Sequence, residues 1–265
     1  MKIKLLSYEV VNNFKAPIQT KEIYMANDLI EKSGQATVVI KVFHKSKERY
    51  FTKDKDGKSV PTEFYILQQL QDYSFVPTVF DYFTSKFYAY VVMENLAYEW
   101  QDLFQFTQEP INEKELRHIM IEMIKVLGQM SSLNLHYLDI KPNNVMIHLE
   151  SRNIKFIDFE SVFYEEDETS NRIVGSMGYI SPECMRRQSY NIKASQVFSL
   201  GCFMYFSIED TVAYKNIKEI ENNCKRKYKI CSENLQNLID ECLHRDPNKR
   251  IQFDNLLSHK WFTEV

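Results

Sequence analysis

The residues best suited by type and spacing to do chemistry lie in the stretch LHYLDIKPNNVMI, at Asp139, Lys141 and Asn144. Their spacing lets one short loop direct a carboxylate, an ammonium and an amide into one cleft. Transfer of the γ-phosphoryl group of ATP needs a base for the acceptor hydroxyl, a cation for the phosphoryl group and oxygen ligands for magnesium. We therefore predict Asp139 and Lys141 as catalytic residues and Asn144 as a magnesium ligand. Taken alone, the stretch also fits a turn, since Pro and Asn are common turn formers.

A further acidic residue, Asp158, follows the apolar run in IKFIDFE, fourteen residues after Asn144. A second magnesium ligand is expected at such a position. Two independent matches at compatible spacing weigh against the simple turn. The residues therefore predict that ATP and Mg2+ are the cofactors, with Asn144 and Asp158 as the metal ligands.

Upstream, the run ATVVIKVF places Lys41 in an otherwise apolar strand. A lysine there is costly unless its stem reaches the surface or its ammonium is paired. Glu63, on the helix that follows, is the predicted partner, and the pair would hold the α- and β-phosphates of ATP. Taken alone, such a lysine could equally well lie on an edge strand and point outward into solvent.

The elements that must position these residues change in character near residue 96. Before it, the runs YEVVNNF, KEIYMA, ATVVIKVF and FYAYVVMEN are β-like, and PTEFYILQQL has helical spacing. After it, apolar residues recur at helical spacing, and Asn112 with Glu115 is placed like an N-terminal capping box. We therefore predict an α+β protein with a small antiparallel sheet and one main helix over 1–95 and a mainly helical lobe over 96–265.

Composition narrows the class of protein. A chain of 265 residues with 44% hydrophobic content can bury a full core, and its formal charge of −3 gives no overall basic field for nucleic acid. The sequence contains no run of about 18 uncharged apolar residues, so a membrane span is not expected. The five cysteines are odd in number and form no CxxC pair, so reduced thiols in a cytoplasmic or nuclear protein are expected. The polar stretch 45–60 is predicted to be a solvated loop.

Together these motifs resemble the eukaryotic protein kinase superfamily from about residue 7 to residue 263. Besides VVIK, DIKPNN and DFE, the segment GSMGYISPE is similar to the end of a kinase activation segment, and there Glu183 would pair with Arg250 of HRDPNKR. SQVFSLGC resembles the central buried helix of the larger lobe, and LLSHKWF the closing helix. Lysine two places after Asp139 is the serine/threonine-type signature, so protein substrates are implied.

Within the superfamily, NLAYEWQDLFQF, INEKELRHIMIEMIKVL and the C-terminal stretch look most like the Pim kinases. Gln196 stands where most kinases have aspartate, and the Pim subgroup is similar in lacking an acid at that position. The resemblance also implies protein substrates with basic residues near the phosphoacceptor. Glu99 or Asp102 would contact these basic side chains. Asn143, however, stands where the Pim pattern has an acid. A solvated helix start would explain Glu99 and Asp102 equally well.

The resemblance further implies an adenine site. FYAYVVMEN is similar to the strand that enters the interlobe hinge, which makes Met93 the gatekeeper and Glu94 and Leu96 the residues whose backbone would contact adenine. Four apolar residues would sandwich the ring: Ile23, Val39, Met146 and Ile157. Ordinary core packing is the alternative for each of these residues.

The chain departs from the family pattern around the nucleotide. Its first 33 residues contain no glycine, so FKAPIQTKEIYMA cannot form the usual Gly-rich loop, in which glycines allow the backbone to approach phosphate. Val39 stands where the family favours alanine and would narrow the adenine slot. Glu160 replaces the glycine after Asp158 and Phe159, and strain of about 1–2 kcal/mol is expected if that position needs a positive φ. The missing glycines and Val39 predict weaker ATP binding, and Glu160 is expected to bias the orientation of Asp158 or to perturb metal binding.

A second departure from the family pattern concerns regulation by phosphorylation of the activation segment. Tyr137 and Leu138 replace the histidine and arginine that usually precede the catalytic aspartate, so a phosphorylated activation segment would lack its main counter-charge. Phosphorylation at Thr169, Ser170 or Ser176 is therefore not expected to act in the usual way. The acidic run 165–168 could meet basic groups or could be a solvated loop.

Three functions fit the sequence. The retained charged set favours an active serine/threonine protein kinase. The missing glycines, Val39 and Glu160 favour a pseudokinase that binds partners or nucleotide without transferring phosphate. A small-molecule phosphotransferase shares the spacing from Asp139 to Asn144, but GSMGYISPE and Arg250 speak against it, because it needs no peptide platform.

Overall fold

The computed structural model describes residues 4–5, 7–14, 22–29, 33–103, 111–186, 189–222, 227–228 and 231–264. The chain forms two compact units, the first made of residues 1–100 and 155–160 and the second of residues 101–154 and 161–265. The first segment of the first unit runs to Trp100, and its second segment, 155–160, carries Asp158.

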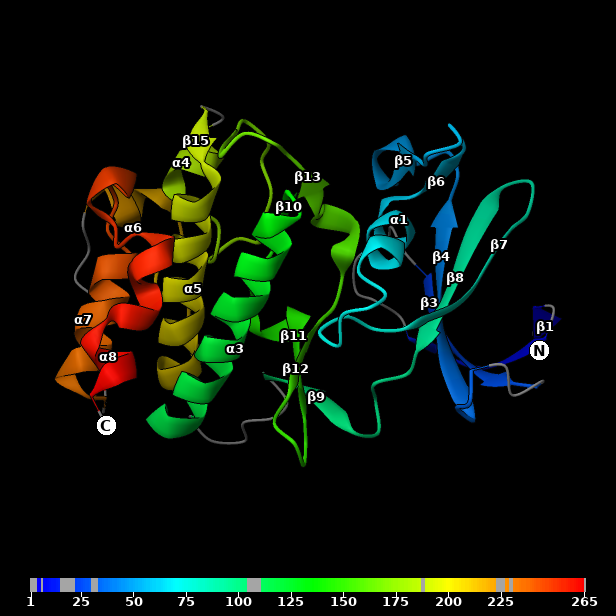
Figure 1. Ribbon diagram of the computed structural model, residues 1–265, viewed down its shortest axis with the longest axis horizontal. Helices are drawn as coiled ribbons and strands as arrows, with labels where there is room; N and C mark the ends of the chain where they lie inside the picture. Colours follow the sequence, from blue (N-terminus) through cyan, green and yellow to red (C-terminus); the bar gives the residue numbers. More distant parts are fainter. Residues whose placement is uncertain are drawn as a thin grey trace. The chain divides into compact units, whose positions relative to one another are not determined.

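Within the described residues, the main sheet of the first unit has six antiparallel strands in the order β1-β2-β3-β4-β8-β7 (Figure 1). Their bounds are β1 Lys4–Leu5, β2 Tyr8–Phe14, β3 Glu22–Asp28, β4 Thr37–His44, β7 Val79–Thr84 and β8 Tyr88–Glu94. β2, β3, β4 and β8 fall on the four runs that the sequence analysis identified as β-like. One face of the sheet is an apolar cluster of Tyr8, Ala26, Val38, Ile40, Val42 and Val92.

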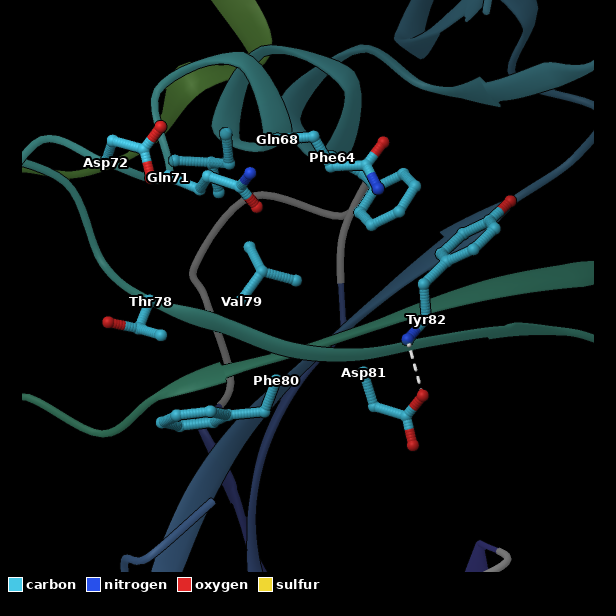
Figure 2. Close-up of a pocket in the computed structure, with 10 residues that line it drawn as sticks. Phe64, Gln68, Gln71, Asp72, Thr78, Val79, Phe80, Asp81 and Tyr82 are labelled. Carbon is cyan, nitrogen blue, oxygen red and sulfur yellow. Dashed lines mark hydrogen bonds between the residues drawn. The ribbon is translucent and has the colours of Figure 1, made fainter. Parts of the chain in front are cut away.

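Helix α1, Thr62–Gln69, packs on this sheet through Phe64, whose ring stacks on that of Tyr82 in β7 with centroids 4.1 Å apart. Beside the stack, α1 and β7 enclose a cavity of about 460 Å3, with Gln68 on the helix side and Val79 on the strand side (Figure 2). The stack holds α1 against β7. It thereby fixes the position of Glu63, the neighbouring residue in the helix.

The stretch 45–60 is mostly exposed, as the sequence analysis expected, but it is not a loop. It contains the turn η1, Glu48–Tyr50, and a hairpin of β5, Phe51–Lys53, and β6, Ser59–Pro61. The side chain of Asp54 closes the hairpin by accepting hydrogen bonds from the backbone N–H groups of Asp56 and Lys58 at 2.9 and 2.8 Å. Local side-chain to backbone bonding therefore gives this charged stretch an ordered structure.

The second unit is mainly helical (Figure 1). Its helices are α3 Glu113–Ser132, α4 Pro182–Met185, α5 Ile192–Glu209, α6 Ile217–Glu221, α7 Glu233–Cys242 and α8 Lys260–Thr263, with the 3-10 turns η2 Pro142–Asn144, η4 Pro247–Lys249 and η5 Phe253–Ser258. Its strands are β10 Leu135–His136, β11 Val145–His148, β13 Phe163–Tyr164, β14 Thr169–Ser170 and β15 Tyr190–Asn191. Three elements span the boundary between the units: β9 Trp100–Asp102, β12 Ile154–Phe156 and η3 Phe159–Ser161.

The helices begin where side chains can cap them. The Asn112 side chain accepts a hydrogen bond from the backbone N–H of Glu115 at 3.0 Å, which confirms the predicted cap of α3. Asn191 caps α5 in the same way, through the backbone N–H of Ala194. With an antiparallel sheet in the first unit and a helical second unit, the predicted α+β class is confirmed.

The centre of the second unit is α5, which is buried around nearly its whole circumference and packs against α3 and α7. Gly201 makes the approach to α7 possible, because a Cβ built on it would lie 2.7 Å from the Cβ of Cys242 and 2.9 Å from the Cγ of Leu243. Both distances are too short for real contacts, so any side chain at Gly201 must push α5 and α7 apart.

We expect Gly201→Ala to lower the free energy of unfolding by about 1–3 kcal/mol, because overpacking outweighs the gain in helix propensity. Gly128→Ala is a matched control within α3, where a built Cβ would meet no neighbour nearer than an atom of Phe253 at 4.0 Å. That variant is expected to gain up to about 1 kcal/mol. Denaturant unfolding measures both changes, and equal effects of the two substitutions would contradict the close contact.

Two further observations bear on the sequence analysis. Among the described residues, no helix combines the length and apolar character needed to cross a membrane. The cysteines Cys184, Cys202, Cys231 and Cys242 carry free thiols, and Cys224 lies outside the described residues.

Candidate active site

In the first unit, a buried ion pair joins the strand β4 to the helix α1. The Lys41 ammonium lies 2.6 Å from Oε1 of Glu63, and the two residues are 8% and 1% exposed. Oδ1 of Asp158 lies 4.0 Å from the same ammonium. Since β4 has β3 on one side and β8 on the other, Lys41 is not on an edge strand. The structure therefore brings three of the predicted site residues together in one unit.

The segment around Asp158 is tied to the same helix. The backbone N–H of Phe159 donates to Oε1 of Glu63 at 3.2 Å, so one carboxylate oxygen holds both Lys41 and this segment. Asp158 has a left-handed backbone with φ of 66°, which costs an L-residue some energy but is tolerated best by Asn and Asp. Glu160 lies in η3 without a positive φ, so the strain expected there falls on Asp158 instead.

The strand register places three of the predicted adenine residues, Ile23, Val39 and Met93, on the face of the sheet that carries Lys41. Ile23 on β3 lies directly opposite Lys41, and Met93 on β8 lies opposite Val39. Directly opposite residues of an antiparallel pair share a face, as do residues two apart along one strand. Val39, Lys41, Ile23 and Met93 therefore share one face, away from the apolar cluster.

The strand β8 ends at a pair of charges that the sequence analysis did not single out. Glu94 accepts hydrogen bonds from Lys155 at 2.6 Å and from the backbone N–H of Thr78 at 3.0 Å. Its own N–H donates to the carbonyl of Thr78, and the carbonyl of Leu96 accepts from the N–H of Trp100. The side chain of Glu94 thus fixes the segment whose backbone was expected to contact adenine.

In the second unit, three side chains meet at the carboxylate of Asp139. Lys141 donates to Oδ2 of Asp139 at 2.9 Å, and the Asn144 amide nitrogen donates to the same oxygen at 2.9 Å and to the Asp139 carbonyl at 3.0 Å. The Ser176 hydroxyl donates to Oδ1 of Asp139 at 2.6 Å and accepts from Lys141 at 2.8 Å. Every predicted residue of the phosphotransfer loop is therefore in contact with Asp139.

Ser176 is a functional candidate whose role the sequence analysis missed. It was named only as a phosphorylation site, but its hydroxyl is hydrogen-bonded to both Asp139 and Lys141. Gly178, two residues on, has a φ of 90°, and a Cβ there would lie 2.8 Å from a methyl group of Val212. The glycine therefore lets the chain turn back at Ser176. The paired glycines of GSMGY were the sequence signal for this turn.

The residues before Asp139 are buried and apolar in character. Leu138 packs in a cluster with Phe163, Ile180, Cys184, Tyr190 and Ile192, so it brings no cation to the activation segment. Gln196, which is 1% exposed, donates through Nε2 to the carbonyl of Tyr137 at 3.2 Å. The helix α5 thus holds the backbone that leads into the loop.

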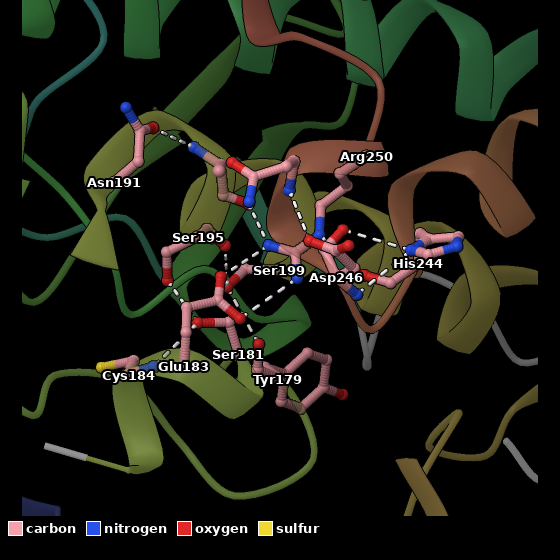
Figure 3. Close-up of polar contacts among 12 residues, drawn as sticks. Tyr179, Ser181, Glu183, Cys184, Asn191, Ser195, Ser199, His244, Asp246 and Arg250 are labelled. Carbon is pink, nitrogen blue, oxygen red and sulfur yellow. Dashed lines mark hydrogen bonds and ion pairs between the residues drawn. The ribbon is translucent and has the colours of Figure 1, made fainter. Parts of the chain in front are cut away.

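A buried network supports the segment that carries Ser176 (Figure 3). The Arg250 guanidinium binds both carboxylate oxygens of Glu183, at 2.6 and 3.1 Å, and also donates to the carbonyls of Ala194 and His244. Ser199 of α5 donates to the carbonyl of Tyr179 at 2.9 Å. These bonds fasten the segment to α5.

Several other residues named in the sequence analysis are not part of these two groups of contacts. Met146 lies in the second unit and Ile157 in the first, so their separation is not fixed by the contacts within either unit. Residues 15–21, within the expected phosphate-covering loop, lie outside the described residues. Thr169 is exposed, whereas Ser170 is 5% exposed and its hydroxyl accepts from the N–H of Arg172.

Comparison with known proteins agrees with this geometry. A family model for the protein kinase domain matches residues 25–262, which is nearly the whole chain. The chain therefore belongs to the protein kinase domain family. Several of the relatives it matches are named as serine/threonine-protein kinases, and at 24 to 27% identity to them the chain is a divergent member of the family.

Three of these relatives show the degree of divergence. "Probable serine/threonine-protein kinase fhkD" of Dictyostelium discoideum is 26% identical over 247 residues, which covers 82% of this chain and 32% of the relative. "Serine/threonine-protein kinase ppk6" of Schizosaccharomyces pombe is 27% identical, over 80% of this chain and 28% of the relative. "Serine/threonine-protein kinase pim-2" of Danio rerio is 24% identical, over 87% of this chain and 77% of the relative. The chain thus spans about a third or less of the first two proteins.

Proposed function

We propose that this chain is an ATP-dependent serine/threonine protein kinase that transfers the γ-phosphoryl group of ATP to hydroxyl groups of proteins. The observation that carries the proposal is the arrangement around Asp139, whose carboxylate is held by Lys141, Asn144 and Ser176 through hydrogen bonds of 2.6 to 2.9 Å. A carboxylate fixed in this way can be directed at one acceptor hydroxyl.

Each predicted residue has a chemical role in such a reaction. Asp139 would accept the proton of the acceptor hydroxyl as its oxygen bonds to phosphorus, and Lys141 would offset the charge of the moving phosphoryl group. Lys41, oriented by Glu63, would hold the α- and β-phosphates. The side chains of Ile23, Val39 and Met93 supply the apolar face for adenine, as their shared side of the sheet allows.

The residues present also fit magnesium. Magnesium prefers oxygen ligands, and it would neutralise the phosphate charge when bound. The Asn144 amide nitrogen is already engaged with Asp139, so its oxygen is the atom that can ligate. In the first unit, Asp158 offers a carboxylate 4.0 Å from the Lys41 ammonium. Asn144 and Asp158 are therefore the proposed ligands.

The test is transfer of labelled phosphate from [γ-³²P]ATP with Mg2+ to a basic peptide that contains one serine. We expect label in this peptide and none in the same peptide with alanine in place of serine. A basic peptide is chosen because the resemblance to Pim kinases, with Glu99 and Asp102 past β8, favours basic substrates. Equally little label from the wild type and from Asp139→Asn, with ATP binding retained, would instead favour the second candidate, a pseudokinase.

The pseudokinase candidate rests on the chain's departures around the nucleotide. Val39, which is only half-buried, adds bulk on the face that carries Lys41. The left-handed backbone at Asp158 places an energetic cost on a proposed metal ligand. Both features weaken nucleotide binding rather than remove a reacting group. For this reason we favour slow catalysis over its complete loss.

A further inference from the structure

The acidic run 165–168, which the proposed function does not use, lines a cavity of about 350 Å3 in the second unit. The C-terminal end of α3, the strand β10, the beginning of α5 and η5 form the remaining walls. The lining contains five carboxylates, those of residues 165–168 and of Asp254, and the ammonium of Lys193, which lies 3.8 Å from Glu168 and 3.5 Å from Asp254, so the net charge of the lining is −4. The whole chain carries only −3, so negative charge is concentrated at this cavity.

The acidic run is held at both ends, unlike a freely solvated loop. The backbone N–H of Glu165 donates to the carbonyl of Asn134 at 3.0 Å, and the carbonyl of Glu168 accepts from the N–H of Ile192 at 2.8 Å. Tyr164 also donates its hydroxyl proton to Glu166 at 3.0 Å. The backbone of the run and the carboxylate of Glu166 are therefore held before any ligand arrives, which lowers the entropy lost on binding.

A buried histidine in the same lining lacks a hydrogen-bond donor. His136 is 5% exposed, and its Nε2 lies 3.1 Å from the carbonyl oxygen of Glu165. A carbonyl oxygen only accepts, so Nε2 must carry the hydrogen. Burial lowers the pKa of His136 and favours the neutral ring, in which Nδ1 is an acceptor. Nδ1 has no hydrogen-bond partner.

The chemistry that this lining recognises is that of a cationic donor with several N–H groups. The acidic groups do not converge on one point: among the described residues, no three His, Cys, Asp or Glu side chains are placed to hold a metal ion. A guanidinium group offers five N–H donors in a planar fork and can contact several separated acceptors at once. Arginine therefore fits the cavity better than a metal ion or a single ammonium group.

We propose that this cavity is a docking site for an arginine-containing basic segment of a partner protein. The carboxylates of Glu166 and Asp167, both exposed, would contact the guanidinium groups first, and a rotation of the buried His136 ring would bring Nδ1 to a donor at the floor of the cavity. This docking does not depend on phosphoryl transfer, because the residues involved are not those of the proposed active site.

The test is fluorescence anisotropy, without nucleotide, of a labelled glycine-serine peptide that carries three arginines. The control peptide has citrulline, a neutral isostere, in place of each arginine and is expected not to bind. Glu166→Gln with Asp167→Asn should weaken binding of the arginine peptide about tenfold, equivalent to ~1.4 kcal/mol. Glu150→Gln with Glu233→Gln removes the same charge from exposed positions outside the cavity and should leave affinity within about twofold. Equal weakening by both double variants would overturn the proposal.

A second pair of variants tests the floor of the cavity. His136→Asn keeps a polar acceptor near the position of Nδ1, whereas His136→Gln keeps a donor near Nε2 and no acceptor at Nδ1. We expect the arginine peptide to bind the glutamine variant more weakly than the asparagine variant when both melt as cooperatively as the wild type. Tighter binding of spermine than of the arginine peptide would show a polyamine site instead and would also overturn the proposal.

Discussion

Replacing Asp139 with asparagine is expected to lower kcat for peptide phosphorylation by about 10²- to 10⁴-fold, because the amide cannot accept the proton of the acceptor hydroxyl. Asparagine has nearly the same shape as aspartate: its single acceptor oxygen can still accept from Lys141, which lies 2.9 Å from Oδ2, and its amide nitrogen can donate to the Ser176 oxygen, which lies 2.6 Å from Oδ1. The loss should therefore appear in the chemical step and not in folding. Initial rates at saturating ATP, together with the melting temperature, measure the two separately.

A matched control separates the role of Asp139 from a general loss of charge. Asp56→Asn makes the same chemical change at an exposed turn between β5 and β6, where the aspartate contributes its backbone N–H to Asp54. This variant is expected to keep wild-type kcat. Retention of more than a tenth of wild-type kcat by Asp139→Asn would contradict the assignment of Asp139 as the base.

The strands and the helix caps were predictable because their causes are local. Short runs of β-branched, aromatic and other apolar residues mark β2, β3, β4 and β8, and the cap of α3 needs only Asn112 and a backbone N–H three residues away. The hairpin of β5 and β6 has an equally local cause in Asp54, but its charged composition concealed it. Composition is therefore a poorer guide than the specific hydrogen bonds that one side chain can make.

The residues that the sequence could not place depend on contacts between distant segments. Ser176 reaches Asp139 across 37 positions, and no periodicity encodes such a contact. The strain expected at Glu160 lies at Asp158, because the N–H of Phe159 is bound to Glu63 and sets the backbone just before it. Motif spacing was enough to identify the reacting groups, whereas the residues that contact them could be identified only from the folded structure.

Replacing Arg250 with alanine is expected to lower the free energy of unfolding by about 3–5 kcal/mol, because it leaves the buried carboxylate of Glu183 without a counter-charge. The Arg250 side chain is fully buried, at 0% exposed, and the Glu183 side chain is 10% exposed. The substitution also leaves the carbonyls of Ala194 and His244 without this donor. Denaturant unfolding at neutral pH measures the loss.

The control is a second arginine–glutamate pair of the same unit. Arg186 lies 3.0 Å from Glu221, but the two side chains are 41% and 47% exposed, so Arg186→Ala should cost at most about 1 kcal/mol. The double variant Arg250→Met with Glu183→Leu removes both buried charges and should recover stability relative to Arg250→Ala, since no unpaired ion remains. If Arg250→Ala and Arg186→Ala cost the same, burial is not what makes the Glu183 pair important. The large difference expected between them follows from water, which solvates an exposed carboxylate left without its partner and cannot reach a buried one.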